Sequence, residues 1–222
     1  MPLIDATATL LLIDLQQRLV PAISGAQAML ANARILSQAA NLLGMPVVVT
    51  EQYPKGLGRS LPGLIPDRTQ DRAQDRAQGR AQGRAQDRAQ DRAQDRAHDR
   101  AQDRAHDRAQ DQTQGQALAK VSFDACATSE ILDRLAPARS LIVAGCESHV
   151  CVLQTVLTLL AQGRAVYVAA DATGSRSTGN HQAALTRMAA HGAEIVTTEM
   201  ILFEVMRSAE HPAFRQISAM VK

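Results

Sequence analysis

The residue best placed for chemistry is Cys151, a thiol between a short apolar run and a segment with helical spacing. Residues 140–145 (SLIVAG) form the apolar run, the chain turns at Gly145, and residues 152–162 have the helical pattern. Unpaired backbone N–H groups and peptide dipoles at a helix N-terminus favour a thiolate, so the sequence predicts a lowered pKa for Cys151. A nucleophilic cysteine also needs a nearby base.

Polar residues follow the other short apolar runs and could supply that base. Asp14 follows the first run, Glu51 with Gln52 and Tyr53 ends the second, and Lys120 lies near a third. In open α/β sheets, ligands bind beyond the carboxyl ends of the strands. A carboxylate, an ammonium and a thiol that meet at this edge would form a workable nucleophilic site.

The elements that must position these residues alternate between strand and helix patterns. Apolar runs of strand length lie at residues 9–14, 46–51, 140–145, 165–171 and 194–198, with a candidate strand near 120–123. Helical spacing occurs at residues 26–43, 152–162 and 180–191, each followed by a glycine typical of a helix C-terminal cap. The pattern predicts a doubly wound α/β fold.

Length and composition predict a globular protein. The chain has 222 residues, 45% of them hydrophobic, and a formal net charge of +2. A near-neutral chain gives no reason to expect a nucleic-acid partner or an anionic membrane surface. We expect no membrane segment and no signal peptide, because no apolar run spans a bilayer and no basic segment precedes the first apolar patch. Three cysteines are an odd and sparse set, which favours a reducing, cytoplasmic location.

Residues 67–114 are a tetrapeptide repeat of the type DRAQ. The repeat contains no apolar residue larger than alanine, so it cannot belong to a core. It is either a binding arm for nucleic acid or protein, or a tandem expansion tolerated in a surface loop. Its near-zero net charge and lack of aromatic residues favour the expansion. We therefore expect a single domain over residues 1–222, interrupted by the repeat.

Several ordered segments together resemble the isochorismatase-like cysteine hydrolases. Segments similar to the three active-site segments of that family are IDLQQ (13–17), KVSFDA (120–125) and AGCESHVCVLQT (144–155). Segments that resemble the subgroup of isochorismatase domain-containing proteins are TEQYPKGLG (50–58), DATGSR (171–176) and ALTRM (184–188). The resemblance covers the chain apart from the repeat.

This resemblance implies a Rossmann-like three-layer sandwich with a six-stranded parallel sheet and a triad of Asp14, Lys120 and Cys151. In such a triad Asp14 takes the thiol proton, Cys151 attacks a carbonyl carbon, and Lys120 stabilises the charged forms of both. The resemblance also implies a non-proline cis peptide near Cys146 and Glu147, in a turn that aims backbone N–H groups at the oxyanion.

Four further residues are candidates for contact with the substrate. Gln16, Gln52 and Tyr53 are chosen for their positions at strand ends. His149 lies two residues before Cys151 and either orients the substrate or has a packing or hydrogen-bonding role.

The same resemblance argues against a metal. Nicotinamidases of the family carry an Asp and His metal cluster after the second strand, where this chain has residues 51–53 (EQY). Cys146, His149 and Cys151 also lack the spacing of zinc ligands. We expect no metal and no cofactor, and nicotinamide is disfavoured as a substrate.

The expected function is a cysteine hydrolase that cleaves a small amide, carbamoyl or related acyl substrate through a thioester on Cys151. Family members commonly assemble, so we expect a homo-oligomer with a small-molecule substrate. The alternative is a family-like scaffold that acts mainly in protein interaction, with the repeat as a binding arm.

Overall fold

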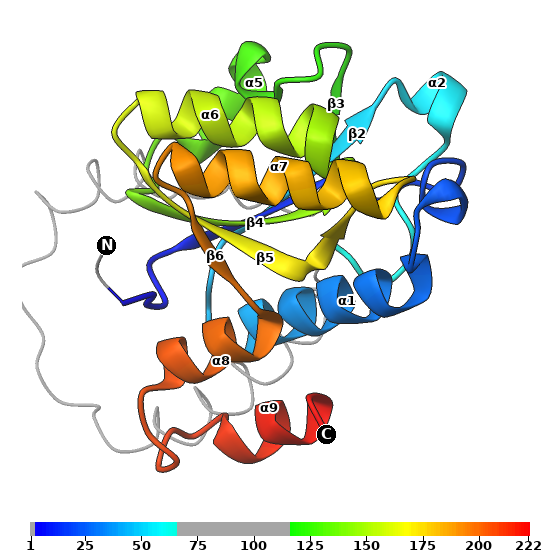
Figure 1. Cartoon of the computed structure of the whole chain (residues 1–222). Helices are drawn as coiled ribbons and strands as arrows, with labels where there is room; N and C mark the ends of the chain where they lie inside the picture. The colour runs from blue at the N-terminus through cyan, green and yellow to red at the C-terminus, as the bar shows by residue number, and fades with distance from the viewer. Residues whose placement is uncertain (1–2, 66–115) are drawn as a thin grey trace, which may run out of the picture. The chain divides into compact units, whose positions relative to one another are not determined.

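The structure is a computed structural model that describes residues 3–65 and 116–222 (Figure 1). The repeat at residues 67–114 lies outside the described residues. That it interrupts a single domain therefore stays a prediction. Residues 3–65 and 117–222 form one compact unit. None of the helices within it has the length and hydropathy needed to cross a bilayer.

The centre of this unit is a six-stranded sheet in the order β3-β2-β1-β4-β5-β6 (Figure 1). Every neighbouring pair is parallel. The strands are β1 (Thr9–Ile13), β2 (Val47–Gln52), β3 (Leu118–Lys120), β4 (Ser140–Cys146), β5 (Ala165–Gly174) and β6 (Glu194–Val196). The predicted Rossmann-like, parallel α/β fold is confirmed.

Helices cover both faces of the sheet and give the predicted three layers (Figure 1). One face carries α1 (Ala26–Leu42), α8 (Thr198–Met206) and α9 (Phe214–Met220). The other carries α5 (Ser129–Leu135), α6 (Leu153–Ala161) and α7 (Thr178–Ala190). The short helix α2 (Pro54–Leu57) follows the end of β2.

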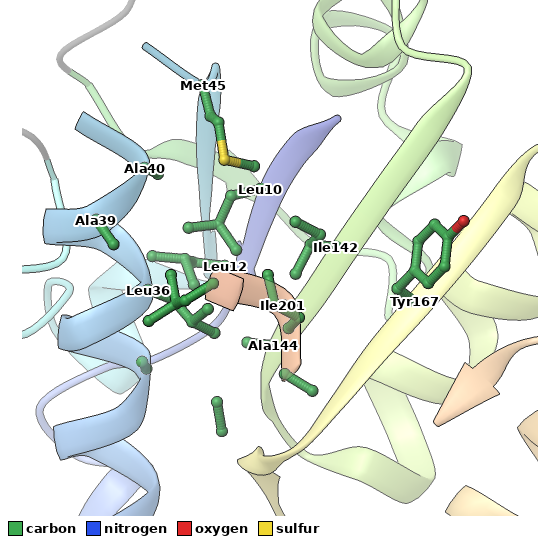
Figure 2. Packing of buried hydrophobic residues seen from close by; sticks show 14 of the residues in the cluster. Leu10, Leu12, Leu36, Ala39, Ala40, Met45, Ile142, Ala144, Tyr167 and Ile201 are labelled. Carbon is green, nitrogen blue, oxygen red and sulfur yellow. The ribbon is translucent and has the colours of Figure 1, made fainter. Parts of the chain in front are cut away.

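Strand β1 is buried on both of its faces, which accounts for its run of apolar residues. Leu10 and Leu12 belong to the apolar cluster on the α1 side, whereas Leu11 and Ile13 belong to the cluster on the α6 side. Successive side chains of a strand point to opposite faces, so a strand between two helical layers must be apolar at every position. Figure 2 shows Leu10 and Leu12 packed among Leu36 of α1 and Ile142 of β4.

The third strand begins and ends earlier than predicted. The sequence suggested residues 120–123, but β3 spans Leu118–Lys120, so Lys120 is its last residue. Strand β5 is longer than predicted, because an irregularity between Val143 and Gly145 shifts the register and lets pairing with β4 continue to Gly174. Helices α5, α8 and α9 were not predicted.

Candidate active site

A buried ion pair joins the ends of two strands. Asp14 directly follows β1 and Lys120 ends β3, with β2 between these strands in the sheet. The distance from Lys120 Nζ to Asp14 Oδ2 is 2.7 Å, and both side chains are 0% exposed. The carboxyl edge of the sheet thus brings together the predicted carboxylate and ammonium.

Strand β2 supplies a partner to each member of this pair. The Thr50 hydroxyl donates a hydrogen bond to Asp14 Oδ1 at 2.7 Å. Lys120 Nζ donates to Gln52 Oε1, also at 2.7 Å. Residues two apart on a strand face the same side, so Thr50 and Gln52 both reach the site while Glu51 points away from it.

The Lys120 ammonium has two further acceptors in the segment that follows β3. These are the backbone carbonyl oxygens of Ser122 and Phe123, each 3.3 Å from Nζ. A buried ammonium needs acceptors for its three protons, and the carboxylate, the amide oxygen and these carbonyls provide them. The charged form of Lys120 therefore has a full set of partners.

Cys151 lies in a π-helical turn, η3 (Ser148–Val152), that runs directly into α6. The residue is 5% exposed. The pKa of its thiol is raised to about 12, mainly by burial and then by the negative charge of Asp14, while the positive charge of Lys120 acts in the opposite direction. The predicted lowering of this pKa is wrong, because the sequence pattern showed the helix start but not the desolvation. The thiol is protonated at neutral pH and needs a base when it reacts.

The end of β4 closely approaches β1 just before the turn to η3. Gly145 has φ +122°, and a Cβ atom there would lie 2.0 Å from the backbone oxygen of Ile13. Only glycine fits this position. The next peptide bond, Cys146–Glu147, is cis, at the place that the sequence resemblance implied.

Residues after β5 fasten the same turn. The Glu147 carboxylate accepts hydrogen bonds from the backbone N–H of Arg176 at 3.1 Å and from its Nε at 3.0 Å. Ser148 Oγ lies 2.8 Å from His181 Nδ1, and burial lowers the pKa of that imidazole. The turn that leads to Cys151 is therefore tied to the start of α7.

His149 has two partners in the same region. Its Nδ1 lies 2.9 Å from Ser175 Oγ, and its Nε2 lies 3.4 Å from Asn180 Nδ2. These contacts fit the hydrogen-bonding alternative for His149. They leave substrate orientation as a prediction.

The amides of Gln16 and Gln52 are hydrogen bonded within the protein. Gln16 Nε2 donates to the backbone oxygens of Gln52 at 3.0 Å and Gly58 at 2.7 Å, and its Oε1 accepts from the Gln52 N–H at 2.8 Å. The Gln52 side chain contacts Lys120 and also donates to the Val121 carbonyl at 2.6 Å. Both residues support the site from within.

Tyr53 directly follows β2 and has an exposed side chain. It is 55% exposed and directly precedes α2. Its backbone N–H donates to the Lys120 carbonyl at 2.8 Å. Tyr53 is thus free to contact a ligand, while its backbone fixes the end of β3.

Glu51, the first of the three residues (51–53) considered for a metal site in the sequence, has partners within the protein. Its carboxylate contacts Arg59 Nη1 at 3.1 Å and accepts from the Ser60 N–H at 2.7 Å. Within residues 3–65 and 116–222, no three or more His, Cys, Asp or Glu side chains are grouped so that they could hold a metal ion.

The other two thiols are buried and free. Burial raises the pKa of Cys126 to about 12 and that of Cys146 still further. Cys126 packs in the cluster on the α6 side, and Cys146 Sγ lies 3.7 Å from Met29 Sδ on the opposite side of the sheet. Cys126 is influenced by the charges of Asp124 and Arg164, and Cys146 by those of Asp14 and Glu147, whereas Cys151 is influenced by both members of the buried Asp14–Lys120 pair.

Sequence reasoning missed several supporting residues. Thr50 carried a usable signal, since it lies two positions before Gln52 on the same predicted strand. Ser175 and Arg176 lie in the segment DATGSR (171–176), whose resemblance marked them without assigning a role, whereas Asn180 and His181 carried no signal.

Comparison with known proteins places this site in a family context. The family model for the isochorismatase domain matches residues 8–200. Isochorismatase domain-containing protein 1 of Salmo salar is 31% identical, across 99% of this chain and 62% of the relative. Isochorismatase domain-containing protein 2 of Bos taurus is 30% identical, across 99% of this chain and 85% of the relative. The chain therefore spans less than two thirds of the length of the salmon relative.

A solved structure gives the same result for the fold. The MAR1 ribonuclease from Caenorhabditis elegans is 27% identical and superposes with a TM-score of 0.72. The match covers 99% of this chain and 92% of the nematode chain.

Proposed function

Because this chain belongs to the isochorismatase family, whose members are hydrolases, we propose that it cleaves a small amide, carbamoyl or related acyl substrate through a thioester on Cys151. The observation that carries the proposal is the buried Asp14–Lys120 pair, whose two charges both act on the Cys151 thiol. A base, a cation and a nucleophile in one desolvated place can perform acyl transfer.

In the first step, Cys151 Sγ attacks the substrate carbonyl carbon while its proton moves to the Asp14 carboxylate. This transfer suits a thiol that is protonated at rest. The Lys120 ammonium stabilises the sulfur as it acquires negative charge. Backbone N–H groups of the turn before Cys151 are the proposed donors to the oxyanion.

In the second step, the carbon–nitrogen bond breaks and protonated Asp14 gives its proton to the leaving amine or ammonia. A thioester remains on Cys151. In the third step, Asp14 takes a proton from a water molecule, whose oxygen attacks the thioester carbon. The carbon–sulfur bond then breaks, and Asp14 returns the proton to the departing sulfur, which releases the acid and restores the thiol. Asp14 thus acts in turn as base, acid, base and acid.

The proposal includes a small substrate and no metal. Asp14 and Lys120 are fully buried and Cys151 nearly so, which suits a compact acyl group rather than a polymer. Glu51 and Gln52 are already committed to Arg59 and Lys120, so the donors at the metal position of other relatives are occupied. We also propose that the chain works as a cytoplasmic homo-oligomer without a bound cofactor or nucleic acid.

RNA cleavage is the activity named for the nematode relative. The burial of Cys151 and the formal net charge of +2 do not favour an RNA substrate here. RNA is nevertheless a useful member of the test panel, because its cleavage would replace acyl transfer as the function.

The test compares three proteins on a panel of small amides, carbamoyl compounds, ureas and RNA. Wild type and Cys126→Ala are expected to hydrolyse the same carbon–nitrogen substrate, and Cys151→Ala to lose at least 10³-fold in kcat. Cys126 is the matched control because it is also a buried, free thiol. Mass spectrometry of the quenched reaction should find the acyl group on the peptide that contains Cys151.

Turnover that survives the loss of Cys151 would contradict the mechanism. If no hydrolysis is found but the full chain binds a partner protein through residues 67–114, the scaffold alternative is correct.

A further inference from the structure

Gln52 has hydrogen bonds that fix which way its amide points. The Lys120 ammonium can only donate and the Val121 carbonyl can only accept. The amide must therefore turn its oxygen to Lys120 and its nitrogen to Val121, as the distances of 2.7 and 2.6 Å show. No flipped amide would satisfy both neighbours.

The backbone of Gln52 is equally constrained. Gln16 donates to its carbonyl and accepts from its N–H, so one side chain holds both polar groups of the Gln52 peptide backbone. With Gln52 only 9% exposed, neither end of the residue has freedom to move. Because Lys120 Nζ donates a hydrogen bond to Gln52 Oε1, the fixed Gln52 side chain also restrains the position of the ammonium.

The charge of Gln52 matters as much as its geometry. Asp14 and Lys120 form a buried pair with no net charge, and the thiol of Cys151 is neutral. A neutral amide holds the ammonium without drawing its charge away from the other two groups. A carboxylate at the same place would compete with Asp14 and with the nascent thiolate for the single cation.

We propose that Gln52 is a positioning residue, which holds the Lys120 ammonium between Asp14 and Cys151 and, by being uncharged, leaves that cation available to the sulfur. This role rests on the proposed function and assigns Gln52 to Lys120 rather than to the substrate. Thr50 holds Asp14 from the same face of β2. Segment TEQYPKGLG (50–58) thereby supports the acid–base pair of the site.

The test substitutes Gln52 by glutamate, which has the same shape and adds one negative charge. The readout is the rate at which iodoacetamide alkylates Cys151, followed by mass spectrometry of its peptide between pH 7 and 9.5. With a pKa near 12, set by burial and by the facing Asp14 and Lys120, the wild-type rate should rise about tenfold per pH unit. Gln52→Glu should keep this slope and lower the rate at each pH by at least about tenfold, because the added charge disfavours the thiolate.

Two companion variants make the result specific. Gln162→Glu adds the same charge at an exposed position at the end of α6, and its alkylation rate should stay within about twofold of wild type. Gln52→Met keeps the volume and removes both hydrogen bonds without a charge. It should lower kcat at least tenfold on a panel substrate while KM changes less than threefold, as expected of a residue that does not bind substrate.

The inference is overturned if Gln52→Glu is alkylated as fast as wild type, or if Gln52→Met raises KM and spares kcat. If Gln52→Glu slows alkylation but the wild type hydrolyses nothing on the panel, the proposed function is wrong while the role of Gln52 stands. The two proposals can therefore be refuted independently.

Discussion

Replacing Lys120 with methionine is expected to destabilise the fold as well as abolish activity. The substitution removes a fully buried cation that lies 2.7 Å from Asp14 Oδ2. Asp14 would keep the Thr50 hydroxyl and the Cys151 thiol as neutral side-chain hydrogen-bond donors, and Gln52 Oε1 would lose the donor Lys120. A buried carboxylate would thus remain without the charge that balances it.

The size of the effect follows from this geometry. Two unit charges 2.7 Å apart attract by about 6 kcal/mol at an effective dielectric constant of about 20. Much of this attraction offsets the cost of desolvation, and breaking a buried pair from one side costs about 3–5 kcal/mol. We expect Lys120→Met to lower the free energy of unfolding by about 3 kcal/mol, since the hydrogen bond from Thr50 to Asp14 remains.

A double variant separates the charge effect from the loss of packing. Asp14→Asn combined with Lys120→Met leaves no charge in the site. The double variant should therefore be about 1–2 kcal/mol more stable than Lys120→Met alone. Lys55→Met is the control, because Lys55 is exposed on α2, and it should change stability by less than about 0.5 kcal/mol.

The assay is equilibrium unfolding in urea followed by far-UV circular dichroism, because the chain has no tryptophan. The reasoning is refuted if Lys120→Met costs less than about 1 kcal/mol, or if adding Asp14→Asn brings no recovery. Either result would mean that the two side chains are not a buried, mutually compensated pair.

Two other substitutions or deletions test the frame around the site. Gly145→Ala should prevent folding or cost at least about 3 kcal/mol in thermal or urea unfolding, because its Cβ would lie 2.0 Å from the Ile13 oxygen. Gly163→Ala is the control, because Gly163 also has a positive φ but has open space around its Cβ position. It should lower the free energy of unfolding by only about 1 kcal/mol, and an equal loss of stability in both variants would contradict the steric argument. Deleting residues 67–114 should leave turnover within about twofold and stability within about 1 kcal/mol, since the repeat lacks core-forming residues; a larger loss in urea unfolding or kinetics would overturn the single-domain prediction.

The parts of the fold that could be predicted are those set by local pattern. The run at residues 9–13 (TLLLI) was predictable as a strand buried on both faces, because four consecutive apolar residues in a short segment are typical of a parallel strand between two helical layers. Lys120 was harder to place, since β3 has only three residues and its strand character comes from pairing with β2. Helices α8 and α9 follow the last strand and pack on the α1 side of the sheet. The sequence did not predict them, because which face they cover depends on tertiary contacts.

The candidate site also has parts that the sequence predicts and parts that it does not. The strand ends predicted that Asp14 and Lys120 would share an edge, because parallel strands bring their carboxyl ends together. The pKa of Cys151 could not be predicted with the right sign, because desolvation depends on what covers the thiol. Gln52 ends β2 and Gln16 lies three residues beyond the end of β1, but the sequence does not show that their amides already have partners within the protein.

The raised pKa of Cys151 and the neutrality of Gln52 have one consequence for the mechanism. A preformed thiolate would place two anions and one cation in a buried site, at a high cost in solvation. When the proton instead passes from sulfur to Asp14, one anion is replaced by another and the net charge of the site stays at zero. The Lys120 ammonium then needs only to remain where it is, within reach of both atoms, and the Gln52 oxygen holds it there. In the proposed mechanism Asp14 is therefore the required proton acceptor, and we expect attack on the substrate only when thiol, carboxylate and ammonium are all in place.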